Sequence, residues 1–282
     1  MKRHFVSLAC LLGALPLGMS TSAAVAAEPA WTETGTSYVD SLSGGQGLAS
    51  RADGSLLHRG LASIPLGLRI KGWNHVGDPD IAQGYVFDAY QGPDTATSKM
   101  FAVTTPAGKR SEYVHQLDPG EKLNNSFATV SPDGQWLVSG EWGDQNRLQV
   151  FPAPLLNPST PPTGGALPQA GQITLDKPVR DIQGCDFVDA TRLLCASDDS
   201  SRTLFPEDRP LLQVDLERKV DGGPVTGHVS SLFALPQRSL CTDGTYEAEG
   251  VDYDTARGML RAEVVQPGTC AVATSVYAYR LR

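Results

Sequence analysis

Two glutamates stand close together in the segment YEAEGVDYD, at Glu247 and Glu249. Successive side chains of a β-strand alternate between its two faces, so this spacing places both carboxylates on one face. Two carboxylates at that distance repel each other unless a cation, an arginine or a shared proton stabilises them. The pair therefore predicts a Ca²⁺ site or a general acid/base pair. The alternative is an acidic strand edge that is exposed to solvent.

His75, in the segment WNHVGDPD, is the candidate for metal binding or proton transfer. A neutral imidazole binds metals, and its proton exchanges near neutral pH. Asp78 lies three positions later, on the opposite face of a regular strand. His75 and Asp78 reach one metal site only if the strand contains a bulge, which Gly77 favours. In the alternative interpretation, Asp78 only stabilises a turn before Pro79.

The elements that must position these residues are hairpins. In FATVSPDGQWLVSG, Pro132 has the φ that the second position of a type I turn requires, and Gly134 closes the turn. No segment keeps helical apolar spacing over three turns, and Gly and Pro interrupt the chain throughout. Similar hairpins, most of them roughly 50–60 residues apart, turn at Asp53, Ala82-Gln83-Gly84, Asp189 and Asp254.

Further β-rich runs follow the hairpins, so each repeat predicts four antiparallel strands. Such a repeat occurring about five times is typical of a β-propeller. The segment TSYVDSL, Thr36–Leu42, precedes the first hairpin and can supply the fourth strand that the last repeat lacks. We expect an all-β fold in which residues 28–282 form a single five-bladed propeller, closed by this N-terminal strand. The Pro/Gly-rich segment 157–171 is interpreted as a surface loop, and a β-sandwich is the alternative architecture.

Several of these segments resemble known propeller repeats. VSPDGQWLVSG resembles the Ser-Pro-Asp-Gly repeat of TolB-type and YVTN-type propellers, and GLASRADGSLL is similar to an NHL-type hairpin. GVDYDTARGML is similar to blades of several extracellular propellers. This resemblance implies the architecture and no particular reaction, because the fold hosts many activities. Glu249-Gly250 resembles a fragment of lactonase-like propellers in which the glutamate is a metal ligand.

The first residues of the inner strands of a propeller form one rim of its central channel, where ligand sites are usually built. Counting back from the turns places a polar residue there in nearly every repeat. Trp73, beside His75, is a candidate to stack on a sugar. In the alternative interpretation, these polar residues only line a hydrated channel. The predicted ring consists of Gln46, His75, Asn125, Asp181 and Glu247.

Residues 1–27 have the features of a secretory signal peptide. Lys2 and Arg3 precede the short apolar run Val6–Met19, and small residues end the segment. The apolar run is too short for a membrane anchor, and no later stretch has the length of a membrane span. We therefore expect a secreted, extracellular protein.

Export gives a structural meaning to the four cysteines that follow residue 27. They have no Cys-x-x-Cys spacing, so disulfides are favoured over a zinc site. Cys185 and Cys195 are equidistant from the predicted turn at Ala190, and they face each other across the hairpin. Cys241 and Cys270 then pair by elimination.

The formal net charge is −8, and the chain has no cluster of Lys and Arg, so nucleic acid is not an expected partner. An acidic chain is compatible with divalent cations. Ca²⁺ suits the carboxylate oxygens, whereas His75 would prefer a transition metal. The chain contains neither a Gly-x-Ser-x-Gly elbow nor a His-Glu-x-x-His motif.

These patterns predict a monomer that binds a small polar ligand or a divalent cation on the propeller axis. In one hypothesis it is a hydrolase or lyase acting on an extracellular carbohydrate, lactone or ester. Glu247 or Glu249 would then be the acid/base, His75 the proton carrier or ligand, and Asn125 would orient the substrate. In the alternative hypothesis, the chain is a non-catalytic module that binds glycans or proteins.

Overall fold

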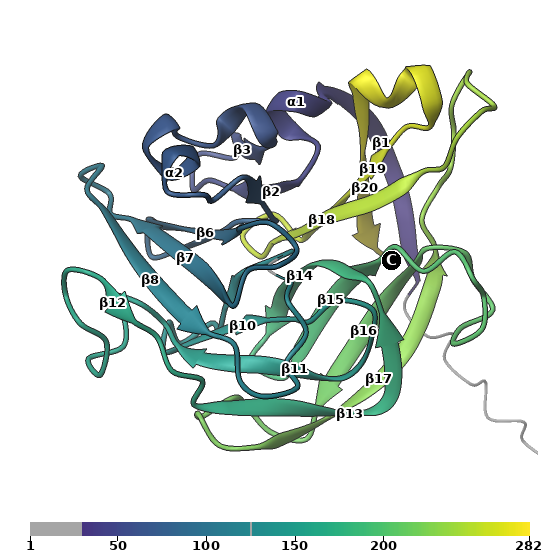
Figure 1. Ribbon diagram of the computed structural model, residues 1–282. Helices are drawn as coiled ribbons and strands as arrows, with labels where there is room; N and C mark the ends of the chain where they lie inside the picture. Colours follow the sequence, from purple (N-terminus) through teal and green to yellow (C-terminus); the bar gives the residue numbers. More distant parts are fainter. Residues whose placement is uncertain (1–29, 125) are drawn as a thin grey trace, which may run out of the picture.

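The computed structural model describes residues 30–124 and 126–282 and shows an all-β propeller of five units around a common axis (Figure 1). We call these units blades 1 to 5 in chain order. The expected signal peptide lies outside the described residues. Within the described residues, no helix is long and apolar enough to cross a membrane.

Blade 5 contains both ends of the described chain. Strand β1 (Trp31–Asp40) pairs antiparallel with the last strand, from Trp31 opposite Leu281 to Asp40 opposite Ala273. This confirms the predicted closure by an N-terminal strand. The strand begins earlier than predicted and ends at Asp40, whose side chain caps the short helix α1 (Ser41–Gly44). The other strands of the blade are β18 (Glu247–Asp254), β19 (Met259–Val265) and β20 (Ala273–Leu281).

Blades 3 and 4 each have four antiparallel strands and share one continuous sheet. Their outermost strands run parallel and pair from Ile173 opposite Val225 to Leu175 opposite Gly227. The strands of blade 3 are β9 (Thr129–Val130), β10 (Trp136–Ser139), β11 (Asp144–Pro152) and β13 (Gly171–Arg180). Those of blade 4 are β14 (Ile182–Asp189), β15 (Arg192–Ser197), β16 (Pro210–Leu216) and β17 (Val225–Ala234).

Blade 2 has a divided inner strand. Both pieces pair with β6. Val76 and Asp80 are four positions apart, whereas their partners in β6, Tyr90 and Phe87, are three positions apart. The extra residue is the bulge that Gly77 favours. From the Pro/Gly-rich loop, β12 (Gly165–Ala166) adds a parallel pair to β8. The other strands are β4 (His75–Val76), β5 (Asp80–Ala82), β6 (Tyr85–Gln91), β7 (Ser98–Thr104) and β8 (Arg110–Gln116).

Blade 1 departs from the four-stranded pattern. It contains only the hairpin of β2 (Gly47–Ser50) and β3 (Leu56–Arg59). The 3₁₀ turn η1 (Leu61–Ser63) and the helix α2 (Leu66–Ile70) follow the hairpin in place of outer strands. Leu68, which is fully buried, packs with the core of blade 2 from this helix. The helical segment thus covers the neighbouring blade.

The hydrophobic core lies between neighbouring blades. Phe87 and Phe101 of blade 2 pack with Leu137 and Phe151 of blade 3 in one buried cluster. Similar clusters join blades 3 and 4 and blades 4 and 5, while a smaller one joins the helical segment of blade 1 to blade 2. Because apolar burial is the main favourable contribution to folding, these layers hold the ring together.

Both predicted disulfides are present. Cys185 and Cys195 are cross-strand partners in β14 and β15, with Cα atoms 4.0 Å apart. Cys241 and Cys270 join the segment before β18 to the 3₁₀ turn η2 (Gly268–Val272). Two disulfides are typical of a protein that folds in an oxidising compartment.

Candidate functional site

Asp78 lies on the propeller axis and is almost fully buried, with 1% of its surface exposed. Its carboxylate oxygens accept backbone hydrogen bonds from two other blades. Oδ1 accepts from Leu48 N at 2.9 Å and Oδ2 from Val251 N at 3.0 Å. The backbone N–H of Asp78 donates to Ser126 O of the chain that enters blade 3. The Asp78 side chain therefore serves as an acceptor that joins inner strands.

Glycines surround Asp78. Gly47, Gly184 and Gly250 come from blades 1, 4 and 5, and a Cβ on any of them would overlap with an atom of Asp78. Only glycine allows this close approach of the three backbones. Asp78 and the backbones of these three glycines fill the axis at this point. Their packing separates the region at the starts of the inner strands from the region at their ends.

At the start of the inner strands, buried carboxyl groups lie between blades 1 and 5. Glu249 Oε1 accepts a hydrogen bond from Gln46 Nε2 at 3.3 Å, and Glu263 Oε1 lies 3.1 Å from His58 Nδ1. Burial, and next the charge of Glu247, raises the pKa of Glu249 well above its usual value. Burial raises the pKa of Glu263 to about 7. Glu249 and Glu263 therefore keep their protons to a higher pH than an exposed glutamate does.

The predicted pair of glutamates does not lie on one regular strand face. The register of β18 against β19 shifts between Ala248 and Val251. Glu247 is exposed, whereas Glu249 is buried. A bulge changes the direction of side chains, so the alternation that the sequence suggested ends at this point.

The structure also locates the remaining residues of the predicted site. The ring of His75 is half-buried, its pKa is lowered by burial, and no hydrogen bond or ion pair joins it to Asp78 among the described residues. Trp73 packs against the small cluster between blades 1 and 2. Asp181 Oδ1 accepts from Gly143 N at 2.9 Å and links the ends of blades 3 and 4. Asn125 lies outside the described residues.

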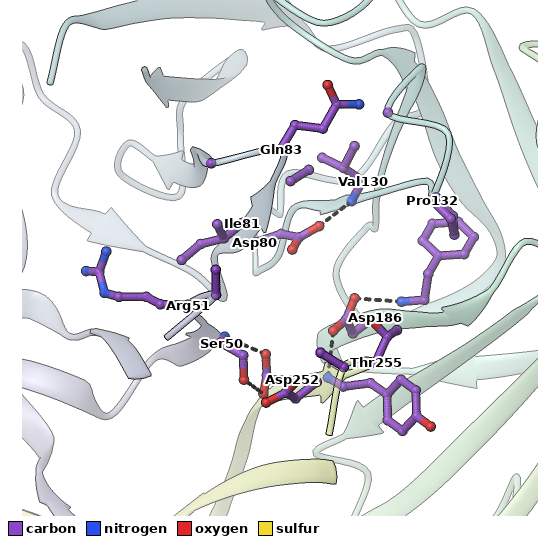
Figure 2. A pocket seen from close by; sticks show the side chains of 18 of the residues that line it. Ser50, Arg51, Asp80, Ile81, Gln83, Val130, Pro132, Asp186, Asp252 and Thr255 are labelled. Atoms are coloured by element: carbon purple, nitrogen blue, oxygen red, sulfur yellow. Dashed lines mark hydrogen bonds between the residues drawn. The ribbon is translucent and has the colours of Figure 1, made fainter. Parts of the chain in front are cut away.

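A pocket of about 880 Å³ opens at the other end of the axis, where the inner strands end (Figure 2). The turns that follow the inner strands of blades 1, 2, 3 and 5 form its walls, together with the end of β14 from blade 4. The sequence prediction placed the site at the strand starts and missed this pocket. Its lining includes Ser50, Arg51, Asp80, Ile81, Gln83, Pro132, Phe187 and Thr255.

Three aspartates from three blades meet in this pocket: Asp80, Asp186 and Asp252 (Figure 2). Each accepts a backbone hydrogen bond from a neighbouring blade. The donors are Val130 N at 2.7 Å to Asp80, Tyr253 N at 2.6 Å to Asp186, and Ser50 N at 2.6 Å to Asp252. These carboxylates therefore hold blades together and also face the pocket.

All three carboxyl groups have raised pKa values, and burial is the largest cause for each. Burial raises the pKa of Asp80 to about 6. Burial and the charges of Asp80 and Asp252 raise the pKa of Asp186 well above its usual value. Burial also raises the pKa of Asp252, although hydrogen bonds from Ser50 and the charge of Arg261, 2.9 Å away, oppose the shift. Carboxyl groups in such different surroundings can hold different protonation states, as acid/base chemistry requires.

One sequence signal could have revealed this group. Asp186 in GCDFVD and Asp252 in GVDYD stand inside inner strands, before the turn aspartates Asp189 and Asp254. Burial of a charged residue within a strand costs free energy unless the charge is paired. Such a residue therefore usually has a structural or functional role. Following the strand interiors rather than their starts would have identified the pocket.

No protein family model matches this sequence, and no curated protein matches it. Solved structures that are similar to this chain include the following two. The native Bacillus subtilis arabinanase Arb43A has 11% sequence identity and a TM-score of 0.43, with 88% of this chain and 92% of the arabinanase covered. The tail fiber of Staphylococcus aureus phage P68 has 10% identity and a TM-score of 0.33, with 73% of this chain and 50% of the fiber chain covered.

Proposed function

We propose that the protein binds a small hydroxyl-rich ligand of the carbohydrate class in the axial pocket and cleaves it by carboxyl acid/base catalysis. One observation carries the proposal: Asp80, Asp186 and Asp252 enter a single pocket from three blades, with raised pKa values. The two disulfides favour a role outside the cytoplasm.

The pocket suits such a ligand in size and chemistry. Its volume of about 880 Å³ lies within the range of small-molecule sites. Carboxylate oxygens accept hydrogen bonds from sugar hydroxyls, while Arg51 and Gln83 supply donors at the wall. Ile81 and Tyr253 add apolar surface against which a sugar ring can pack.

The proposed reaction uses Asp80 as the proton donor. With a pKa of about 6, its carboxyl group is partly protonated near neutral pH, which suits protonation of a leaving oxygen. Asp252, which the Arg261 guanidinium favours in its charged form, would activate water. Glycoside hydrolysis requires such a division between an acid and a charged carboxylate. Lactone and ester hydrolysis would use the same base.

The residues predicted at the strand starts give a second catalytic arrangement, in which Glu247, Glu249 and His75 act as acid, base or metal ligand. This arrangement predicts that Ca²⁺ or another divalent ion contributes to binding. It differs from the first because the close packing at Asp78 separates the two ends of the axis. Variants at the two ends therefore distinguish the two proposals.

The test combines ligand binding with turnover. A panel of oligosaccharides, lactones and aryl esters is screened by calorimetry and product analysis, with and without a chelator. Asp80→Asn is compared with Glu249→Gln and with the exposed control Asp94→Asn. Loss of turnover in Asp80→Asn alone supports the first arrangement, and loss in Glu249→Gln alone supports the second.

Two further results bear on the enzyme proposal. Binding without turnover of any substrate would contradict catalysis and support a non-catalytic glycan-binding module. That outcome agrees with the observation that each pocket aspartate already accepts a hydrogen bond from a neighbouring blade. If the wild-type protein shows neither binding nor turnover with any compound of the panel, the proposal as a whole is overturned.

A further inference from the structure

A second group of potential ligands lies away from the axis, at the junction of blades 2 and 3. His115 is at the end of β8, and Asp118 and Glu121 follow in the next turn. One ligand atom from each of the three lies within 4.8 Å of the others, and within the described chain no other group of three His, Cys, Asp or Glu residues meets this criterion. This group is independent of the axial pocket.

The turn between the ligands explains why they meet. Glu121 N donates to Asp118 O at 2.9 Å, with Pro119 and the left-handed Gly120 between them. Pro followed by Gly at the two central positions is typical of a type II turn. Asp118 N in turn donates to Glu121 Oε2 at 2.9 Å. The turn therefore directs the Glu121 carboxylate back toward the end of β8.

The hydrogen bonds of His115 leave one contact that requires a positively charged partner. His115 Nδ1 lies 3.1 Å from Leu167 O, a group that can only accept, so Nδ1 carries a hydrogen. In the neutral ring, Nε2 then has a lone pair, yet it lies 2.8 Å from Glu121 Oε2, which is also an acceptor. Two acceptor atoms at that distance are stabilised by a proton or by a metal ion between them.

We propose that His115, Asp118 and Glu121 form a binding site for a first-row transition metal ion of the Zn²⁺ class. Imidazole nitrogens and carboxylate oxygens both bind zinc, and three protein ligands leave a fourth position for water. Metal-binding histidines commonly donate their other ring nitrogen to a backbone carbonyl, as His115 does to Leu167. This site goes beyond the proposed function and does not depend on it.

Burial and charge define what this site can bind. His115 has 3% of its surface exposed, and its ring packs against Phe151 with centroids 4.9 Å apart. Asp118 is exposed, so an ion can enter from its side. Lys99 Nζ lies 3.3 Å from Glu121 Oε1 and neutralises one of the two carboxylates. The remaining single negative charge and the imidazole favour Zn²⁺ over Ca²⁺, which takes six to eight oxygen ligands.

For the experiment, the full chain is treated with a chelator, and the chelator is then removed. Titration with ZnCl₂ by calorimetry is expected to show one ion bound per chain, and CaCl₂ to bind more weakly. CoCl₂ is expected to produce visible d–d absorption with the same stoichiometry. Asp118→Asn, an exposed substitution, is expected to weaken Zn²⁺ binding at least about tenfold, and His115→Gln by more.

His228→Gln provides the matched control. His228 also has two acidic neighbours, but Asp176 lies 3.3 Å from Nδ1 and Glu217 3.7 Å from Nε2, on different ring nitrogens. One ion cannot use all three, so this variant should bind Zn²⁺ like the wild type. Absence of equimolar binding by the wild type, or unchanged affinity in Asp118→Asn, would overturn the site. If His115→Gln fails to fold, Asp118→Asn decides the question.

Discussion

Asp78 Oδ2 accepts a hydrogen bond at 3.0 Å from Val251 N, although the two residues are 173 positions apart. The same aspartate accepts from Leu48 N in blade 1. Its backbone pairs with Phe127 at the entry to blade 3, and Gly184 of blade 4 packs against its carboxylate. Through its side chain and its backbone together, this one residue of blade 2 thus contacts all four other blades, and we regard it as the structural centre of the ring.

This role predicts a large loss of stability in Asp78→Ala. The substitution leaves Leu48 N and Val251 N buried without an acceptor, and each such group costs about 1–3 kcal/mol. We expect the free energy of unfolding to fall by roughly 2–6 kcal/mol in urea titrations. Asp94→Ala, at an exposed position, should stay within about 0.5 kcal/mol of wild type. Equal stability of the two variants would contradict the role of Asp78.

Much of the blade architecture follows from short-range signals. The turns at Asp53, Asp189 and Asp254 all join paired strands, as the turn chemistry predicted. The strand that closes blade 5 was also predictable, because its alternating pattern lay unused before the first hairpin. Such features depend on a few neighbouring residues, so a single sequence is sufficient to identify them.

The site was harder to predict because it depends on bulges and distant contacts. One extra residue between Val76 and Asp80 turns Asp78 toward the axis, and a register shift in β18 separates Glu247 from Glu249. A shift by one residue reverses the face of every later side chain. Blade 1 contains only one hairpin because the helix that follows it buries Leu68 against blade 2 and adds no further strands.

The buried carboxyl groups predict that stability falls as the pH rises. Glu263 has an ordinary value of 4.5 and a folded pKa of about 7, so the folded chain binds more protons between these values. The contribution of Glu263 to stability is fully present below pH 4.5 and is lost as the pH rises through 7. Asp80 and Asp198, with pKa values of about 6, act in the same direction. We expect a higher Tm at pH 5 than at pH 8.

The variant Glu263→Gln tests this assignment because it removes one titrating group. Differential scanning calorimetry between pH 4.5 and pH 8 should show a shallower decrease of Tm than in the wild type. Glu112→Gln is the control, since Glu112 is half-buried at the surface and pairs with Lys71. A pH dependence that is identical in Glu263→Gln and wild type would exclude Glu263 as a source of the effect.

The two disulfides should be reduced in a fixed order under native conditions. Both sulfurs of the Cys185–Cys195 bridge belong to residues that are at most 2% exposed, within the core between blades 3 and 4. Cys241, in the segment before β18, and Cys270, in the 3₁₀ turn η2, are both half-buried. A reductant reaches accessible sulfurs first, so we expect Cys241–Cys270 to open before the other bridge. Alkylation at timed intervals followed by peptide mass spectrometry gives the order, and earlier opening of Cys185–Cys195 would contradict the assigned burial.

The closing strand provides the last prediction. Without residues 30–40, β20 would present an unpaired edge from Ala273 to Leu281, and exposed edges promote association between chains. A chain that begins at Ser41 is therefore expected to have a lower Tm, and to form larger oligomers in light scattering, than a reference chain that begins at Ala30.

A synthetic peptide of Trp31–Asp40 tests whether strand pairing is the cause. Added in excess to the shortened chain, it should pair with β20, raise the Tm and reduce the oligomers, because strand addition satisfies the open edge. The same peptide with Thr36 and Tyr38 replaced by proline lacks two backbone donors and should have no effect. If both peptides act alike, or if the shortened chain is as stable as the reference, pairing of β1 with β20 does not stabilise the ring.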